Sequence, residues 1–244
     1  MDENKEKLRV VISANTTWNL VNFRMGLIKE LIAQGFKVHA LASSDMESTT
    51  KLHELGVICH DIKIESSSKS IIQAFLLLNA YVWHVRRIKP VAFLGFTVKP
   101  NIFGSLACMV NGVPTIANIA GLGVAFSGDG WLKKLVTVLY VFGLRKAHTI
   151  FFQNKHDFEL FRANGVIRNQ ITALLPGSGV DTKIFRPIPM PKTETTHFIL
   201  IARLLWEKGI SEYINAAKIL IREGHDCEFI VAGFLDVDNP AAVP

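Results

Sequence analysis

The sequence predicts an α/β protein built on a doubly wound parallel sheet, with a second, smaller Rossmann-like domain of one βαβ unit behind it. Short β-branched runs alternate with longer segments whose apolar residues recur at the helical period, the pattern of successive βαβ units. Residues 186–196 contain three prolines and no apolar periodicity, which predicts a linker. We therefore expect domains at 1–187 and 197–244, joined by a linker at 188–196.

The elements of the first domain follow from this alternation. Strands are expected at 9–14, 37–42, 57–62, 90–96, 114–118, 148–153 and 171–175. Helices are expected between them at 23–34, 48–55, 70–88, 100–111, 132–146 and 155–163. Consecutive parallel strands with crossover helices place all carboxyl ends of the strands at one edge of the sheet.

The second domain shows much less of the same pattern. A strand at 197–202, a helix at 208–223 and a strand at 228–232 make one βαβ unit. A lone unit leaves sheet edges and apolar surface uncovered. We therefore expect it to dock on the first domain, to pair with another chain or to be unstable.

Composition favours an ordered cytoplasmic protein. The 244 residues are 49% hydrophobic, enough for a large core. The three cysteines, Cys59, Cys108 and Cys227, have neither zinc spacing nor the even framework of a small secreted domain, which suits a reducing compartment. The charged N-terminus lacks the basic segment and long apolar core of a secretory signal.

The net charge of +6 suggests an anionic partner. Two strongly apolar segments, 71–85 and 131–144, adjoin lysines and arginines, but both are too short and too interrupted to span a bilayer. Each segment has two interpretations. The favoured one is a core helix of the α/β layer, and the alternative is a helix that presses an apolar, cation-rimmed face onto an anionic membrane surface.

In open parallel sheets ligands bind beyond the carboxyl ends of the strands, so the loops that follow the strands are the candidate sites. The loop after the first strand is polar and precedes a helix whose amides attract anions; an N-cap and turn would also explain it. Glycines in the loop after residue 118 permit close approach of the backbone, although they do not form a dinucleotide fingerprint. The residues singled out are Asn15, Thr16, Thr17, Asn19, Gly121 and Gly123.

Two later loops carry more specific patterns. Gly177 and Ser178 belong to a tight GSGVD turn. After the linker, a strand ends and Arg203 and Lys208 approach the start of a helix, where two cations and free amides suit a diphosphate. The alternative is that these cations pair with surface glutamates such as Glu207.

These two loops, in the order GSGVD, FRP, linker and R-x-x-x-x-K-G, resemble the retaining glycosyltransferases of family 4. The resemblance covers the whole chain and includes the helix at 22–31, the strand at 148–154 and the glycine loop at 118–126. Within that family the sequence is most similar to bacterial enzymes that extend polyprenyl-diphosphate-linked sugars, such as N-acetylgalactosaminyltransferases, and to enzymes of surface-polysaccharide synthesis.

The resemblance implies a GT-B fold and a role for each motif. Arg203 and Lys208 would hold the diphosphate of a UDP-sugar and stabilise the departing UDP without a metal or other cofactor. The loops at 15–19 and 121–123 would line the acceptor side, and Gly177 and Ser178 would lie near the hinge. The acceptor would be a polyprenyl-diphosphate-linked saccharide at the inner face of the plasma membrane. No nucleic-acid partner and no metal are implied, and no catalytic residue is assigned.

Departures from the family pattern leave other hypotheses open. No histidine lies between His84 and His148, where many members carry one, and the paired glutamates that grip the donor sugar are absent, so the chain matches only the front part of such an enzyme. A non-catalytic or split-enzyme module that needs a donor-domain partner is the main rival. An oxidoreductase or epimerase is disfavoured by the missing glycine fingerprint. Asp236 and Asp238 spell a DxD motif, for which a solvated loop is the favoured explanation.

Overall fold

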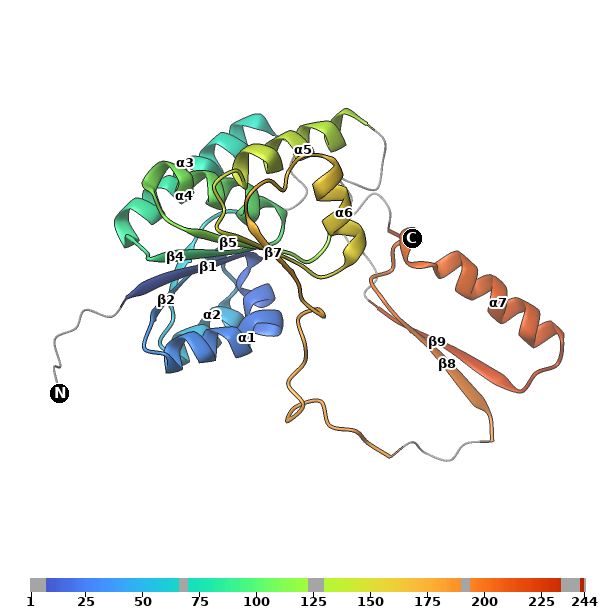
Figure 1. Ribbon diagram of the computed structural model, residues 1–244. Coiled ribbons are helices and arrows are strands. Elements are labelled where there is room, and N and C mark those ends of the chain that lie inside the picture. Colours follow the sequence, from blue (N-terminus) through green and yellow to red (C-terminus); the bar gives the residue numbers. More distant parts are fainter. Residues whose placement is uncertain (1–7, 66–69, 123–129, 190–193, 234–241, 244) are drawn as a thin grey trace. The chain divides into compact units, whose positions relative to one another are not determined.

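The computed structural model describes residues 8–65, 70–122, 130–189, 194–233 and 242–243. It divides the chain into two compact units, Met1–Phe185 and Arg186–Pro244, which we call unit 1 and unit 2 (Figure 1). The division falls close to the end of the first domain expected from the sequence.

Unit 1 contains a seven-stranded sheet in the order β3-β2-β1-β4-β5-β6-β7. Every neighbouring pair of strands in it is parallel. The strands are β1 (Arg9–Thr16), β2 (Lys37–Ser43), β3 (Ile58–Asp61), β4 (Ala92–Phe96), β5 (Thr115–Ile119), β6 (Thr149–Phe152) and β7 (Ile171–Leu174).

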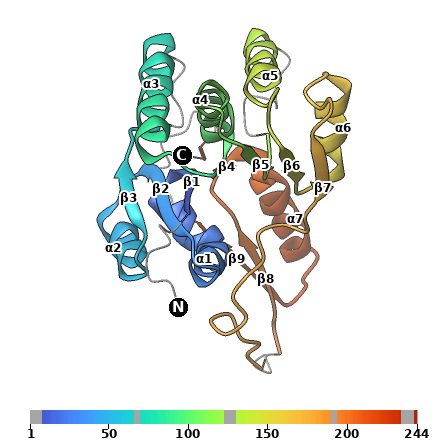
Figure 2. The ribbon, with the colours of Figure 1, turned by 60° about the vertical axis from the view of Figure 1, so that its left-hand side comes forward.

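Helices cover both faces of this sheet. They are α1 (Thr17–Ala33), α2 (Met46–Glu54), α3 (Ile71–Ile88), α4 (Ser105–Asn111), α5 (Trp131–Gly143) and α6 (Lys155–Ala163). Figure 2 shows α1 and α2 on one face and α3, α4, α5 and α6 on the other. The predicted fold class, a doubly wound parallel Rossmann-like sheet, is confirmed.

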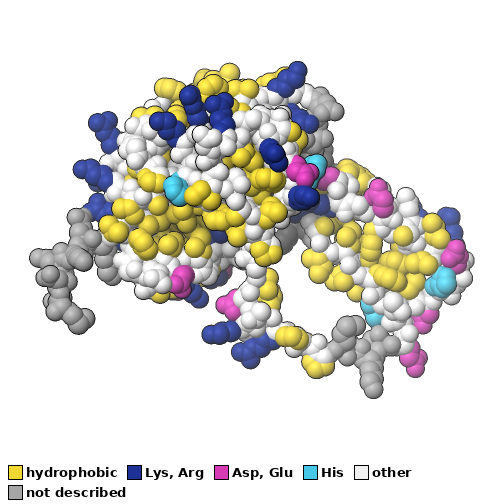
Figure 3. All heavy atoms as spheres, in the orientation of Figure 1, with side chains coloured by type: hydrophobic (Ala, Val, Ile, Leu, Met, Phe, Trp, Pro, Cys, Tyr) yellow, Lys and Arg dark blue, Asp and Glu magenta, His cyan; other side chains and the backbone are white. Residues whose placement is uncertain are grey.

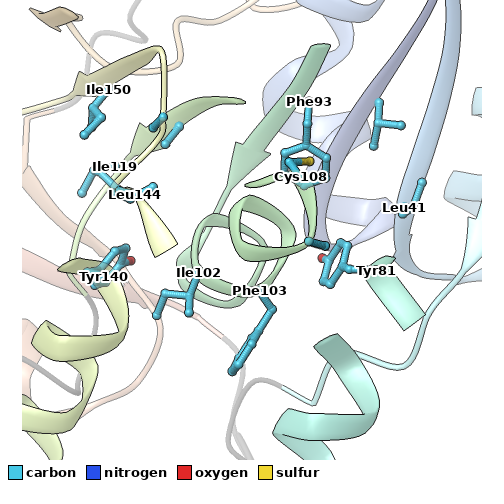
Figure 4. Close-up of a cluster of buried hydrophobic side chains, with 14 of the residues drawn as sticks. Leu41, Tyr81, Phe93, Ile102, Phe103, Cys108, Ile119, Tyr140, Leu144 and Ile150 are labelled. Carbon is cyan, nitrogen blue, oxygen red and sulfur yellow. The ribbon is translucent and has the colours of Figure 1, made fainter. Parts of the chain in front are cut away.

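The two faces of the sheet bury separate hydrophobic clusters, because strands covered on both sides are apolar on both sides. One cluster lies under α1 and α2 and the other under α3, α4 and α5. Figure 4 shows the second cluster, in which Tyr81 and Phe93 lie near Cys108. The Tyr81 hydroxyl is satisfied by Ser13 Oγ at 2.8 Å, so this buried aromatic carries no unpaired polar group.

Two helices begin differently from the sequence expectation. α1 starts at Thr17 rather than residue 23, because Thr16 caps it by accepting a hydrogen bond from the Asn19 amide at 3.2 Å. The helix expected at 100–111 begins as a π-helical turn, Pro100–Gly104, before α4. Gly104 in that turn faces the Phe93 ring so closely that a Cβ would lie 2.2 Å from it.

The apolar segments now called α3 and α5 are core helices on one side only. Leu77, Tyr81 and Val85 of α3 and Tyr140 of α5 are buried, which confirms the favoured interpretation for that side. The opposite side exposes large apolar side chains at Ile71, Ile72, Phe75, Leu76 and Trp83 of α3 and at Trp131, Leu135, Val138 and Phe142 of α5. In Figure 3 lysines and arginines lie among hydrophobic side chains over the upper part of unit 1. None of the helices that the structure describes combines the length and apolar character needed to traverse a bilayer.

Unit 2 contains β8 (Thr196–Ile201), a 3-10 turn η3 (Trp206–Lys208), α7 (Ile210–Arg222) and β9 (Cys227–Ala232). β8 and β9 pair in parallel. The helix begins at Ile210 rather than Lys208, because Gly209 adopts a left-handed conformation with φ 78°. Much of the apolar surface of this two-stranded unit, including Phe198, Ile199 and Ile230, is exposed.

Candidate functional site

The carboxyl edge of the unit 1 sheet contains a topological switch point between β1 and β4. The chain builds outward from β1 to β3, then crosses back to β4 on the other side of β1. Connections on the two sides diverge at such a point, and this is the position at which ligands of open α/β sheets bind. Asn15 at the end of β1 and Thr97 after β4 flank this point, and Thr97 Oγ1 donates a hydrogen bond to Asn15 Oδ1 at 2.8 Å.

The backbone at Thr97 is strained. Its φ is +66°, a left-handed conformation that is rare for a β-branched residue and costs about 1–3 kcal/mol. The π-helical turn Pro100–Gly104 follows directly, and such turns are common at functional sites. Strain and an irregular helix start therefore coincide at the switch point.

Arg24 of α1 places a buried positive charge at the same edge. The residue is 8% exposed, and its guanidinium lies 4.3 Å from the centre of the Phe96 ring, at the end of β4. Nη1 donates to Ser178 Oγ at 2.8 Å, while Nε is buried without a hydrogen-bond partner. Burial lowers the pKa of Arg24, and among the described residues no carboxylate forms an ion pair with it. An unpaired buried cation is costly, and a bound anion would offset that cost.

Polar side chains extend this site along the edge toward β7. Ser178, which follows β7, also receives a long contact from Gln153 Nε2 at 3.4 Å, and the same amide lies 3.4 Å from Asn118 Oδ1 at the end of β5. Asn101 Nδ2 donates to the Asn118 carbonyl at 2.9 Å, and Asn101 Oδ1 is buried without a hydrogen-bond partner. The carboxyl ends of β1, β4, β5, β6 and β7 thus supply one polar, cation-containing strip.

Most of the polar residues predicted after the first strand already form hydrogen bonds within the protein. Thr17 is buried and donates to Asp45 Oδ2 at 2.7 Å. Burial raises the pKa of the Asp45 carboxyl, but hydrogen bonds from Thr17, Ser48 and the Trp18 amide outweigh it and lower the pKa below its usual range. Since Thr16 caps the Asn19 amide, part of the anion-attracting start of α1 is already satisfied. Asn15 is held by Thr97, and Asn19 Oδ1 is buried without a hydrogen-bond partner.

The predicted glycines are described only in part. Gly121 follows β5 with φ 155°, and a Cβ at this position would meet nothing within 4 Å, so the backbone here is open to close approach. Gly177 adopts φ 93°, a conformation that favours glycine, and turns the chain so that Ser178 meets Arg24. Gly123, Asp236 and Asp238 lie outside the described residues.

Arg203 and Lys208 of unit 2 are both exposed and both lie between β8 and α7. Neither forms an ion pair with a described residue, so the surface pairing with glutamates considered from the sequence is not formed. α7 begins at Ile210, and its N-cap residue Gly209 has no side chain to cap it, which leaves the first amides of the helix available to an anion. Within the described residues no group of histidines, cysteines and acidic residues is arranged to hold a metal ion.

Sequence reasoning missed two features of this edge, the buried Arg24 and the strained Thr97. Only the first carries a signal in the sequence. Arg24 lies in the helix expected at 22–31, and no function was predicted for it from the sequence. Leu20, Arg24 and Ile28 follow one another at intervals of four and belong to the buried stripe of α1. A charge within an apolar stripe is a usable signal. Thr97 carries no such signal, because its conformation depends on the chain around it.

The parallel sheet, its strand order and the start of a second βαβ unit define a GT-B-type Rossmann-like fold. The solved structure of Anabaena Alr3699/HepE in complex with UDP and glucose has a TM-score of 0.67 to this chain at 13% identity, covering 93% of this chain and 62% of that one. A UDP-N-acetylglucosamine 2-epimerase also has the fold, with a TM-score of 0.60 at 13% identity, covering 92% and 63%. The fold alone therefore does not separate sugar transfer from epimerisation.

The sequence relatives are more specific. The chain is 26% identical over 254 aligned residues to N,N'-diacetylbacillosaminyl-diphospho-undecaprenol alpha-1,3-N-acetylgalactosaminyltransferase of Campylobacter jejuni, covering 96% of this chain and 65% of that enzyme. It is 24% identical to the capsular polysaccharide biosynthesis glycosyltransferase CapM of Staphylococcus aureus, covering 88% and 58%. No family model matches the chain.

The homologues are thus GT-B glycosyltransferases, as the resemblance in the sequence implied. The chain spans about three fifths to two thirds of the length of these relatives.

Proposed function

We propose that this chain is the front part of a retaining glycosyltransferase that transfers a sugar from a UDP-sugar to a polyprenyl-diphosphate-linked saccharide. Unit 1 would bind the acceptor and unit 2 would begin the donor site. The observation that carries the proposal is Arg24, a buried cation without a carboxylate partner at the switch point, in a chain whose relatives act on lipid-linked and capsular sugars.

The acceptor side follows from the charge at this edge. A diphosphate-linked acceptor would bring negative oxygens to a guanidinium whose Nε has no hydrogen-bond partner. The planar guanidinium group can donate two parallel hydrogen bonds to phosphate oxygens, and the low-dielectric surroundings strengthen the electrostatic attraction. Gln153 and Asn118 would add neutral donors and acceptors for sugar hydroxyls.

On the donor side, Arg203 and Lys208 would bind the diphosphate of the UDP-sugar together with the uncapped amides of α7. When the bond between the anomeric carbon and the β-phosphate oxygen breaks, negative charge accumulates on the departing UDP. Fixed cations and helix amides stabilise that charge without a metal. The acceptor hydroxyl would attach to the same face of the sugar that UDP leaves, which is what retention requires.

A peripheral position on the inner face of the plasma membrane fits the exposed sides of α3 and α5. Their apolar side chains, with Lys133 and Lys134 on α5 and Arg86 and Arg87 on α3, combine hydrophobic area with positive charge. Helices of this kind bind anionic bilayers at the interface. A lipid-linked acceptor would then reach the carboxyl edge of the sheet from the membrane.

A second candidate is supported by unit 2. Its two strands expose Phe198, Ile199, Ile201, Ile230 and Val231, more apolar surface than a complete domain of this kind leaves uncovered. The chain would then be a non-catalytic or split-enzyme module completed by a separate donor-domain chain. Sugar transfer by the 244-residue chain alone would contradict this second candidate, whereas transfer that appears only with a second polypeptide would support it.

The two halves of the proposal can be tested separately by isothermal titration of the 244-residue chain. Farnesyl diphosphate serves as a soluble acceptor mimic and UDP as a donor mimic. Arg24→Gln is expected to weaken farnesyl diphosphate binding by roughly tenfold or more, the loss of one charge-assisted contact, and to leave UDP binding unchanged. The double change Arg203→Gln and Lys208→Gln is expected to weaken UDP binding and to leave farnesyl diphosphate binding unchanged.

Arg168→Gln and Arg222→Gln remove exposed cations outside both sites and serve as controls. If Arg24→Gln and the controls bind farnesyl diphosphate equally, the acceptor assignment is wrong. If UDP binds as well without the Arg203 and Lys208 charges, the donor assignment is wrong.

A further inference from the structure

Unit 1 contains a pocket away from the carboxyl edge of its sheet. It has a volume of about 440 Å³ and lies where β1 and β2 begin and α3 ends. Its lining residues are Arg9, Lys37, His39, His60, Trp83, His84, Arg87 and Ile88. The lining contains three arginine or lysine side chains and no carboxylate.

Three histidines form a continuous chain in this pocket. His39 Nδ1 and His60 Nε2 are 2.9 Å apart in a hydrogen bond, with their rings inclined by only 9°. The His60 and His84 ring centres are 5.0 Å apart, and Trp83 packs edge-on against His84 at 4.6 Å. Burial, followed by the neighbouring histidine and cations, lowers the pKa of both His39 and His84 to about 4, so the rings are neutral near pH 7.

Two imidazole nitrogens and two cations of the pocket lack a hydrogen-bond or ion-pair partner among the residues that the structure describes. His39 is 7% exposed and its Nε2 is buried without a hydrogen-bond partner, as is Nδ1 of His84. Lys37 and Arg87 form no ion pair with any described residue, and Arg87 instead lies over the Trp83 ring at 5.1 Å. Arg9 is fixed by a hydrogen bond to the Ile88 carbonyl.

These groups suit an anion better than a metal ion. Two imidazole nitrogens that share a tetrahedral zinc ion at about 2.0–2.1 Å each lie about 3.3–3.4 Å apart, which is more than the 2.9 Å between His39 Nδ1 and His60 Nε2. The surrounding arginines and lysine would also repel a cation. An anion would instead gain two cations that have no carboxylate partner, and a neutral imidazole can donate from the nitrogen that carries its proton.

We propose that this pocket binds a phosphoryl group, at a site separate from the carboxyl edge of the sheet. Lys37 and Arg87 supply the charge, and the unpartnered His39 and His84 nitrogens supply neutral hydrogen bonds. The exposed Trp83 ring beside them forms an apolar wall for whatever carries the phosphate. The phosphate can belong to a soluble phosphorylated compound or to the headgroup of an anionic lipid.

The test uses inorganic phosphate and the 244-residue chain at pH 7.5. Binding is followed by the ¹⁵N signals of the imidazoles, which report on this pocket and not on other cationic sites. Saturable shifts of the His39 and His84 signals are expected, with a dissociation constant on the order of 1 mM for a small anion held by two charged contacts. Lys37→Gln with Arg87→Gln is expected to weaken this binding at least tenfold. The matched control, Arg168→Gln with Arg222→Gln, is expected to leave it unchanged.

A second arm distinguishes the sources of the phosphate. The same variants are sedimented with vesicles of phosphatidylglycerol and of phosphatidylcholine. Because Arg87 also belongs to the exposed side of α3 proposed to face the membrane, the deciding variant in this arm is Lys37→Gln alone. Loss of both phosphate binding and phosphatidylglycerol binding in Lys37→Gln would assign the site to a lipid headgroup, and loss of phosphate binding alone would assign it to a soluble compound. Histidine signals that do not move with phosphate, or that move equally in the Lys37/Arg87 variant, would overturn the proposal.

Discussion

Arg24 shows how a single residue can favour function over stability. Its guanidinium is buried, unpaired and close to Phe96, so the folded chain bears a desolvation cost that no carboxylate among the described residues offsets. In a protein that binds an anion there, the ligand relieves this cost. Functional sites commonly carry such a stability penalty.

Replacing Arg24 by methionine should therefore stabilise the unliganded chain. Methionine keeps the packing of the alkyl stem and removes the buried charge. We expect the free energy of unfolding to rise by about 1 kcal/mol, measured by urea titration. Arg222→Met, an exposed change, should alter it by less than about 0.5 kcal/mol. A loss of stability in Arg24→Met would show that the contacts with Ser178 and Phe96 outweigh the desolvation.

The histidine pocket makes stability depend on pH. The pKa of His39 is lowered to about 4 in the folded chain, below its usual 6.5, so the unfolded chain takes up a proton first as the pH falls. Stability is then independent of this group above pH 6.5, declines between about 6.5 and 4, and stays at the reduced level below.

Urea midpoints between about pH 7.5 and 5 test this directly. We expect His39→Gln to reduce the decline relative to the unchanged chain, because the variant no longer takes up that proton on unfolding. His53→Gln changes an exposed histidine and should leave the decline of the urea midpoint with falling pH unchanged. Parallel slopes for the two variants would show that His39 is not responsible.

At the scale of the elements, β4 and the π-helical turn before α4 pack so closely that two glycines are needed at their contact. Gly95 approaches Asn101, and Gly104 approaches the Phe93 ring, at distances that a side-chain carbon could not occupy. Asn101 of the same turn donates a hydrogen bond to the Asn118 carbonyl at the carboxyl edge of the sheet.

Two glycine substitutions separate this packing effect from helix propensity. Gly104→Ala is expected to destabilise the chain by about 1–3 kcal/mol, because the new carbon would collide with Phe93. Gly26→Ala lies within α1 with nothing within 4 Å of the new carbon and is expected to stabilise by about 0.5–1 kcal/mol. Both are measured by urea unfolding, and equal effects of the same sign would contradict the role assigned to packing.

At the scale of the whole molecule, the chain divides into two units. No described residue between Leu174 and Thr196 belongs to a helix or strand, and Arg186 lies at the division between the units. Few contacts hold such a segment, which is where proteases cut domains apart.

Limited trypsin digestion should therefore cut the native chain first after Lys183, because the bond between Arg186 and Pro187 resists trypsin. Intact-mass measurement is expected to show an early fragment that contains the unit 1 sheet and persists after unit 2 is degraded. Unit 2 should be lost faster, because its two strands leave apolar surface exposed. First cuts within α3 or α5 would contradict this division.

The order of the strands and helices and the resemblance to GT-B glycosyltransferases could both be predicted from the sequence alone. These properties are local: apolar periodicity depends on neighbours a few positions away, and motifs on adjacent residues. Boundaries were less exact at α1 and α7, where the cap at Thr16 and the left-handed Gly209 fixed the first turn.

Which side chains meet depends instead on how the chain packs in three dimensions. Arg24 meets Ser178, which is 154 positions away, and His39, His60 and His84 come together from two strands and a helix. No local pattern encodes these contacts, because parallel strands adjacent in the sheet are separated in the chain by whole helices. The sheet brings their ends together, and burial then determines which charges are left without a partner.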